Sequence, residues 1–379
     1  MFIGIKSCEK YNDNYAVEVE YIDLFSTRIY PDGKGGQLGD RGHINNIKIL
    51  EVKEDKVIIA DELEKGEYEY SLDTERRNDI AVQHTAEHLF SGIALKDYNL
   101  NNVGFRMGEE VSTIDLDSDS ISDEMVKELS DKVNEAISKG AKVLGTTIMR
   151  HEIETVEGLR KKISPKITDE YIRLIKIEGY DLCACAGFHV GDIKDLKVFK
   201  ILSHERIKGK YTRFTFIAGQ RALKDYEKKS EIIKSFNHKF SCRDNEILEK
   251  FENYQKEHEE LKKSYNQLLQ KYALNLKENI LKNAVEINSH KIVFYHGDKE
   301  LINELKKVFA EEKITFAGFY EDSVLIASED INCSALIKEI IKVDNSVKGG
   351  GGAKQGNIKG NIKGNISEEI IIKSFQNIL

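Results

Sequence analysis

The chain has 379 residues, of which 40% are hydrophobic and 32% charged, and its net charge is −8. This length suffices for about two to four domains with buried cores, and no apolar run approaches the roughly 20 residues that span a bilayer. No basic segment followed by a long apolar core opens the sequence, so we expect no signal peptide. The five cysteines favour a reducing cytoplasm and metal ligands over a disulfide framework. The negative charge argues against a general nucleic-acid binder but allows a local basic groove.

Residues 1–80 are predicted to form a β-rich, barrel-like domain. Segments 15–22, 47–52 and 56–60 alternate or run apolar, with turn residues between them. Between the first two lies Pro31–Gly42, which holds five glycines in twelve residues. Two interpretations stay open for this segment. It is either a long hairpin loop that needs positive φ angles or a backbone that approaches a ligand closely.

A helix is predicted over 79–94, and it carries His84 and His88 four residues apart. At this spacing both side chains lie on one face of the helix. About a hundred residues later, Cys185 and His189 repeat the spacing in a predicted loop. Together the two pairs offer three imidazoles and a thiolate, a complete tetrahedral set for a zinc ion, whether structural or catalytic.

Two alternatives concern these ligands. Cys183 stands two residues before Cys185 and could replace it as the thiol ligand, lie beside the metal or be inert. The string from His84 to His88 also spells H-x-x-E-H, the inverted zinc-protease motif, in which Glu87 would be the general base. That hypothesis leaves the second pair without a role, and it takes its third ligand from the glutamates Glu152, Glu154 and Glu157.

Residues 81–222 are expected to form one α+β domain around the metal site. Residues 104–117 are predicted to be a strand with a turn, and 122–139 an amphipathic helix. Ser122 is the expected N-cap of that helix, and Gly140 follows its end.

Residues 223–284 are predicted to be helical, as a helical hairpin or a coiled coil. They contain no proline or glycine, and apolar and aromatic residues recur at alternating spacings of four and three. This is the pattern of a heptad seam. An intramolecular hairpin and an intermolecular coiled coil fit it equally, so a homodimer is one expectation. The seam consists of Ile247, Phe251, Tyr254, His258, Leu261, Tyr265, Leu268 and Tyr272.

Residues 285–379 are predicted to form a compact α/β domain with a Gly-rich tail. Strands are expected at 291–295 and 323–328, and helices at 300–311, 334–342 and 367–379. The stretch from 348 to 365 is either a flexible linker or a phosphate-binding surface of glycine amides and lysines. The lysines of that surface would be Lys348, Lys354, Lys359 and Lys363.

Several of these segments, in this order, resemble the editing domain of alanyl-tRNA synthetases and the freestanding AlaX editing proteins, in particular their long form. Ile29–Gly42 is similar to the family's loop F-Y-P-x-G-G-G-Q-x-x-D-x-G, with Lys34 replacing a glycine. Gln83–Phe90 resembles the first zinc motif, and Cys185–Val190 resembles C-G-G-T-H-V with Phe188 in place of threonine. Further similar segments are Gly108–Leu116, Phe214–Leu223 and the Gly-rich tail, which DHH-family phosphoesterases share.

The resemblance implies a cytoplasmic hydrolase that removes serine from mischarged tRNA(Ala), with Gly-tRNA(Ala) as a second candidate substrate, without using ATP. It implies tRNA contacts by the C-terminal lysines, no membrane association, and zinc bound by His84, His88, Cys185 and His189. No class II synthetase segment precedes these motifs, so we expect no activation of alanine. A non-catalytic tRNA-binding protein with a structural zinc is the alternative function.

Three residues are candidates for catalysis or selectivity. Gln37 and Thr113 could hydrogen-bond the seryl hydroxyl, which would protect Ala-tRNA(Ala). The alternatives are that Thr113 is an ordinary strand residue and that Gln37 braces its loop. Glu87 could act as a general base, although on an ideal helix it points about 60° away from the ligand face. Because four ligands fill the usual zinc coordination, the metal could orient the substrate or polarise water.

Overall fold

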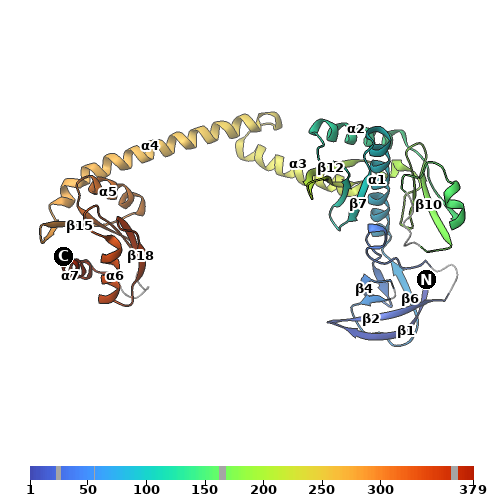
Figure 1. Ribbon diagram of the computed structural model, residues 1–379, viewed down its shortest axis with the longest axis horizontal. Coiled ribbons are helices and arrows are strands. Elements are labelled where there is room, and N and C mark those ends of the chain that lie inside the picture. The colour runs from blue at the N-terminus through green and yellow to red at the C-terminus, as the bar shows by residue number, and fades with distance from the viewer. Residues whose placement is uncertain (23–26, 55, 162–167, 360–365) are drawn as a thin grey trace. The chain divides into compact units, whose positions relative to one another are not determined.

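The computed structural model describes residues 1–22, 27–54, 56–161, 168–359 and 366–379. The chain divides into two compact units, Met1–Lys234 and Ser235–Leu379 (Figure 1). The architecture is mixed α+β in several domains, as the sequence predicts. None of the helices among the described residues is both long and apolar enough to cross a membrane.

The expected domain limits at 80 and 222 fall inside helices. Helix α1 (Thr74–Tyr98) begins five residues before the predicted start at 79, with Asp73 as N-cap. The prediction missed this first turn because its residues are polar and show no apolar periodicity. Helix α3 (Gln220–Phe240) starts two residues before the second limit and continues into the second unit.

The first six strands close into a barrel, which confirms the barrel-like β domain. Its order is β1-β2-β5-β4-β3-β6, and isoleucines and valines such as Ile3, Val17 and Ile44 fill its core. The Gly-rich segment connects β2 to β3 and contains one short 3₁₀ turn, η1 (Lys34–Gly36). The strands are β1 (Phe2–Tyr11), β2 (Asn14–Tyr21), β3 (Gly42–Ile44), β4 (Ile47–Val52), β5 (Val57–Ile59) and β6 (Gly66–Leu72).

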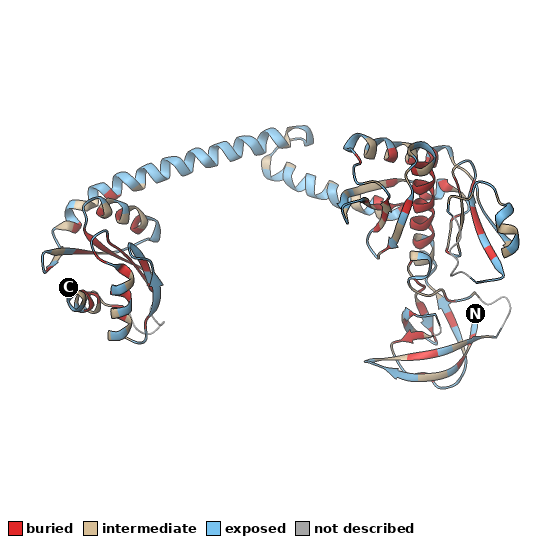
Figure 2. Ribbon diagram, in the orientation of Figure 1, coloured by how far each residue is buried: buried red, intermediate tan, exposed pale blue. Residues whose placement is uncertain are grey.

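Helix α1 is the centre of the rest of the first unit. Every residue from Ile80 to Ala94 is buried, as the continuous red stretch in Figure 2 shows. Phe90 of α1 packs against Phe199 and Phe214 of one sheet, and α2 (Asp123–Lys139) packs on α1 as well. That sheet has the order β12-β13-β8-β7, and a second has the order β11-β10-β9. Their strands are β7 (Asn102–Met107), β8 (Ser112–Leu116), β9 (Val143–Met149), β10 (Tyr171–Ile177), β11 (Asp181–Ala184), β12 (Phe199–Ile207) and β13 (Tyr211–Ala218).

The second unit combines a long helix with an α/β domain. Helix α4 (Ile247–Leu281) follows the short turn η4 (Asp244–Glu246). Six of the predicted seam side chains on α4 are 40–69% exposed (Figure 2), namely Phe251, Tyr254, Leu261, Tyr265, Leu268 and Tyr272. The sheet has the order β14-β15-β16-β17-β19-β18. Its strands and helices are β14 (Val285–Ile287), β15 (His290–His296), α5 (Lys299–Glu311), β16 (Thr315–Tyr320), β17 (Ser323–Ala327), α6 (Cys333–Val343), β18 (Lys348–Gly351), β19 (Gln355–Lys359) and α7 (Glu368–Ile378).

The Gly-rich tail is not a plain linker. Strands β18 and β19 pair with each other, and β19 also pairs with β17, so this stretch joins the sheet edge. Glycine is depleted in strands and shows no apolar alternation, so the glycine-rich sequence gave no strand signal. The backbone can still pair, because the ladder hydrogen bonds need no side chain. Lys363 lies outside the described residues.

Candidate metal centre

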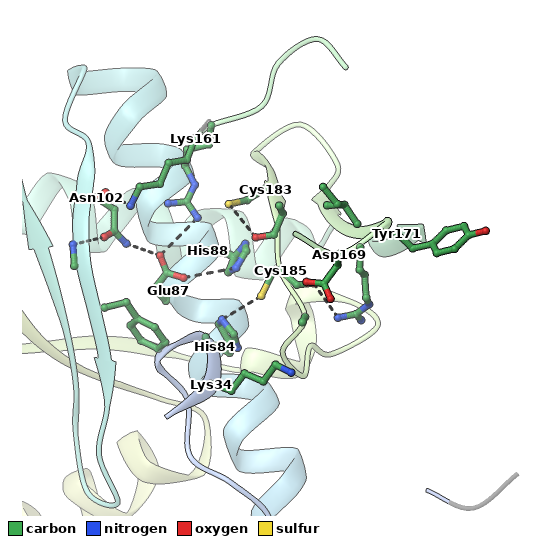
Figure 3. A pocket seen from close by; sticks show the side chains of 18 residues that line it. Lys34, His84, Glu87, His88, Asn102, Lys161, Asp169, Tyr171, Cys183 and Cys185 are labelled. Atoms are coloured by element: carbon green, nitrogen blue, oxygen red, sulfur yellow. Dashed lines mark hydrogen bonds and ion pairs between the residues drawn. The ribbon is translucent and has the colours of Figure 1, made fainter. Parts of the chain in front are cut away.

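Helix α1 and the loop after β11 bring four donor side chains together. Figure 3 shows three of them, His84, His88 and Cys185. The donor atoms of His84, His88, Cys185 and His189 all lie within 4.8 Å of one another. Cys185 Sγ is 3.4 Å from His84 Nε2 and 3.3 Å from His189 Nε2. Bonds of about 2.0–2.3 Å at tetrahedral angles would separate such atoms by roughly 3.5 Å. The group could therefore hold a metal ion.

Each of the three histidines is oriented by an acceptor on its other ring nitrogen. With Nδ1 protonated, every ring offers the lone pair of Nε2 to the common centre, the arrangement that protein metal sites use. Thr85 can only accept from the histidine, because its hydroxyl donates to the Ala81 carbonyl at 2.8 Å. The acceptors are Gln37 Oε1 for His84 at 2.8 Å, Asp181 Oδ2 for His88 at 2.9 Å and Thr85 Oγ1 for His189 at 3.1 Å.

Cys185, rather than Cys183, lies in the donor group. Burial opposes the thiolate of Cys185, but the adjacent imidazoles of His189 and His84 lower its pKa to about 2. Burial raises the pKa of Cys183, whose Sγ contacts only the Ala184 carbonyl, at 3.7 Å, among the hydrogen-bonding groups described. Burial also lowers the pKa of His189 to about 4. A thiolate and a neutral imidazole are the forms that bind metals.

The Gly-rich loop reaches the donor group through Gln37, which is 1% exposed. Gln37 Oε1 also accepts from the backbone N–H of Phe188 at 3.0 Å, and Nε2 is buried without a hydrogen-bond partner among the described residues. A Cβ on Gly187 would lie 2.3 Å from His84 Cε1, so only glycine fits there. In the Gly-rich loop itself, Gly33, Gly35, Gly36 and Gly42 have positive φ, as the hairpin-loop interpretation requires, and the loop contacts the donor group through the side chain of Gln37.

A cavity of about 460 Å³ opens beside the donor group. His84, His88 and Cys185 form part of its wall, together with the ring of Phe105, which stacks on His84. Most of its charged side chains are cationic. The cations are Lys34, Arg160, Lys161 and Arg173, and the carboxylates are Glu87 and Asp169.

Glu87 lies in the wall of this cavity, despite its offset from the ligand face of an ideal helix. Its Oε1 accepts from Ser91 Oγ at 2.7 Å and from Asn102 Nδ2 at 2.6 Å. Burial opposes its charge, but Arg160 and the nearby histidines lower the pKa of Glu87 overall. The carboxylate is thus a weaker base than an exposed glutamate, which argues against its role as general base.

Other candidates from the sequence lie elsewhere. Thr113 pairs with Arg106, whereas the cavity-lining Phe105 pairs with Ile114, so Thr113 is on the opposite face of the β7–β8 hairpin. Thr113 is thus not among the residues that line this cavity. None of the three glutamates proposed for a protease site belongs to the donor group, and Glu152 instead caps the turn η2 (Arg150–Thr155).

Two important residues were missed in the sequence. Arg160 Nε donates to Asp181 Oδ1 at 2.7 Å, and Nη2 lies 3.6 Å from Glu87 Oε1. Asp181 and Cys183 lie on one face of β11 (Asp181–Ala184), and Cys185 follows directly after the strand, so this alternation could have revealed Asp181. Arg160 carries no local signal, because it meets its partners only through the tertiary fold.

In the second unit, Lys348 and Lys359 are cross-strand neighbours on β18 and β19. Lys359 also lies 3.4 Å from Asp322, and Lys354 lies 2.5 Å from Glu329. Like charges opposite each other weaken a strand pair, and an anion bound between them would relieve the repulsion.

Comparison with known proteins gives three kinds of match. Residues 172–215 match the family model described as threonyl and alanyl tRNA synthetase second additional domain. The chain is 31% identical over 287 residues to "Alanyl-tRNA editing protein Aarsd1" of Danio rerio, covering 74% of this chain and 69% of that protein. It is 27% identical over 362 residues to "Alanine--tRNA ligase" of Thermoanaerobacter pseudethanolicus, covering 87% of this chain and 41% of the ligase. A solved DHH domain aligns with 36% of this chain and 33% of its own at 15% identity, with a TM-score of 0.23 that is too low to support a shared fold.

Proposed function

The chain belongs to the family of alanyl-tRNA editing proteins, and we propose that it hydrolyses the ester of tRNA(Ala) mischarged with serine, with Gly-tRNA(Ala) as a second substrate. An aminoacyl ester is already labile, so the enzyme mainly has to position water and stabilise a tetrahedral oxyanion. The proposed partner is mischarged tRNA(Ala), and the proposed location is the cytoplasm.

The observation that carries this proposal is the cavity beside the donor group. Purely structural zinc sites are closed, whereas His84, His88 and Cys185 line a space of about 460 Å³. The cationic side chains around it suit the phosphates of a tRNA end. This favours a catalytic site over a non-catalytic tRNA-binding protein with a structural metal, and the missing glutamate ligand removes the support for a protease.

We propose zinc as the ion, because three imidazoles and a thiolate are ligands that zinc prefers. When bound, zinc would polarise the ester carbonyl or a nearby water molecule. The hydrogen-bond acceptors around the histidines orient the rings for metal binding. Asp181 and Thr85 keep their histidines in one tautomer, and Gln37 does the same from the Gly-rich loop.

Selectivity for serine is assigned to Gln37. Its Oε1 is already bonded to His84 and Phe188, so its unpaired Nε2 is the atom that would meet a substrate hydroxyl or carbonyl oxygen. A site that hydrogen-bonds a hydroxyl rejects the analogue that lacks it, which would spare Ala-tRNA(Ala). Thr113 has no part in this proposal.

The deciding experiment is deacylation of Ser-tRNA(Ala), Gly-tRNA(Ala) and Ala-tRNA(Ala) by the purified full chain, with His88→Ala and Cys185→Ala alongside. We expect hydrolysis of the serine ester, sparing of the alanine ester, and loss of activity in both variants. Indifference of the metal-loaded protein to all three substrates would contradict the proposal. If chelation unfolds the first unit without affecting any activity, the non-catalytic alternative holds instead.

A further inference from the structure

The two carboxylate oxygens of Glu87 have different surroundings (Figure 3). Oε1 is fully used, because it accepts from Ser91 and Asn102 and lies 3.6 Å from the guanidinium of Arg160. Oε2 lies 3.7 Å from His88 Nε2, which is beyond hydrogen-bond distance, and accepts no hydrogen bond from the described residues. The side chain is only 5% exposed, and that small exposure is on the cavity.

His88 cannot satisfy this oxygen. Its Nδ1 is bonded to Asp181 Oδ2 at 2.9 Å, and its Nε2, the atom that would bind a metal, lies 3.7 Å from Glu87 Oε2. Glu87 Oε2 is not among the buried atoms that lack a partner, and Glu87 lines the cavity, so this oxygen is open to a ligand there. Glu87 Oε2 is therefore a hydrogen-bond acceptor in the cavity wall, and a ligand with N–H groups could donate to it.

We propose that Glu87 Oε2 binds the α-ammonium group of the aminoacyl ester, so that the protein selects esters with a free α-ammonium. The inference rests on the proposed deacylase function and adds a substrate class to it. Glu87 would then position the substrate and leave proton transfer to other groups.

The dimensions agree with this role. A charge-assisted N–H···O bond spans about 2.8 Å, and the carbonyl carbon of an amino acid lies about 2.5 Å from its nitrogen. An ammonium on Oε2 therefore holds the ester carbonyl within roughly 5 Å of that oxygen. His88 Nε2 lies 3.7 Å from the same oxygen, so the donor group is within reach of a carbonyl held in this way.

The charges of the cavity also single out Glu87. Lys34, Lys161 and Arg173 suit phosphates and repel an ammonium, and Asp169 is exposed to solvent. Apart from the Cys185 sulfur in the donor group, Glu87 is the buried anion of this wall among the described residues. Esters with a blocked nitrogen, such as N-acylated or peptidyl esters, would lose this contact and also meet a wall.

The test compares two esters of the same tRNA(Ala). One carries serine, and the other carries the isosteric 2,3-dihydroxypropanoyl group, in which a hydroxyl replaces the ammonium. We measure kcat/KM for both with the wild-type chain and with Glu87→Gln. The variant should lower the ratio of serine ester to hydroxy ester roughly tenfold to hundredfold, the size of a charged hydrogen bond, and leave the hydroxy ester and the metal content nearly unchanged. Equal slowing of both esters, or an unchanged ratio, overturns the proposal.

A binding measurement keeps the proposal testable if Glu87→Gln does not fold. The wild-type chain is titrated with two non-hydrolysable adenosine 3′-amides, one seryl and one 2,3-dihydroxypropanoyl, as inhibitors. The seryl amide should inhibit at least about tenfold more strongly, and equal inhibition overturns the assignment. Asp169→Asn is the matched control, and if it rather than Glu87→Gln removes the preference, Asp169 is the anchor and the proposal is wrong. A wild-type chain that hydrolyses no Ser-tRNA(Ala) refutes the deacylase function itself.

Discussion

At the scale of single residues, the metal centre depends on which ring nitrogen of each histidine carries the proton. The spacing of four predicted the ligands because it is a local property of a helix and of a loop. The acceptors Gln37 and Asp181 could not be recognised in the same way, since they come from a loop and a strand that only the fold brings to α1. The position of Glu87 was equally hard to predict, because the geometry of an ideal helix does not show which of its residues will line a cavity.

The two neighbouring cysteines should respond differently to substitution. Cys185→Ala removes a donor from the group, so metal affinity should fall by more than the roughly 10–100-fold typical of losing an outer partner. Cys183→Ala should leave the bound metal per chain unchanged, because Cys183 lies outside the group. Metal analysis after dialysis against a weak chelator measures both, and equal metal loss in the two variants would show that the ligands are assigned wrongly.

At the scale of elements, α1 is unusual because polar residues occupy its buried stretch. Such a helix is stable only if each polar group finds a partner. Gln83 does so by bonding both the N–H and the carbonyl of Ala218, at 2.9 Å each, which joins α1 to the end of β13. The sequence predicted the helix from its apolar residues, but these cross-links were not visible in it.

Gln83→Ala should therefore destabilise the first unit. Two buried backbone groups lose their partners, and we expect the free energy of unfolding to fall by about 2–4 kcal/mol. Urea denaturation followed by circular dichroism measures the change. Gln255→Ala on exposed α4 is the matched control, with an expected change within about 0.5 kcal/mol. A similar effect of both substitutions would mean that these bonds contribute little.

The seam of α4 predicts self-association. Leu261 and Leu268 occupy alternate seam positions and are 69% and 65% exposed, which is costly for leucine unless a second helix covers them. If the wild-type chain is dimeric, Leu261→Glu with Leu268→Glu should make it monomeric, whereas Lys263→Glu, on the outer face, should not. Analytical ultracentrifugation at micromolar concentration gives the masses. A monomeric wild-type chain rules out the seam as a dimer interface.

At the scale of the whole molecule, the sequence predicted the order of its parts better than their limits. Periodicity predicted the central helix, the long helix, the barrel strands β2, β4 and β5, and the C-terminal strands β15 and β17. Helices α1 and α3 run across the expected limits at 80 and 222, so no loop marks a boundary at either position. The tail was ambiguous for a different reason, since glycine fits both a linker and a strand.

Lys348 and Lys359 test whether the second unit contacts RNA. Replacing both by alanine should raise KM for Ser-tRNA(Ala) with little change in kcat, because the candidate metal centre belongs to the first unit. The slope of log affinity against log salt concentration should become shallower by roughly two if each lysine contacts one phosphate. Filter binding over a salt series measures this slope. Lys373→Ala, an exposed lysine on α7, is the control, and a slope equal to that of the control would exclude these two lysines.

The hydrogen bond from His84 to Gln37 also links two events that seem separate. A metal on Nε2 fixes the proton on Nδ1, and that proton is the one that Gln37 accepts. Binding of an ion and the contact between Gln37 and His84 should therefore favour each other, and reciprocity makes the factor the same in both directions. An aminoacyl ligand that stabilises the contact between Gln37 and His84 should consequently slow removal of the ion by chelators.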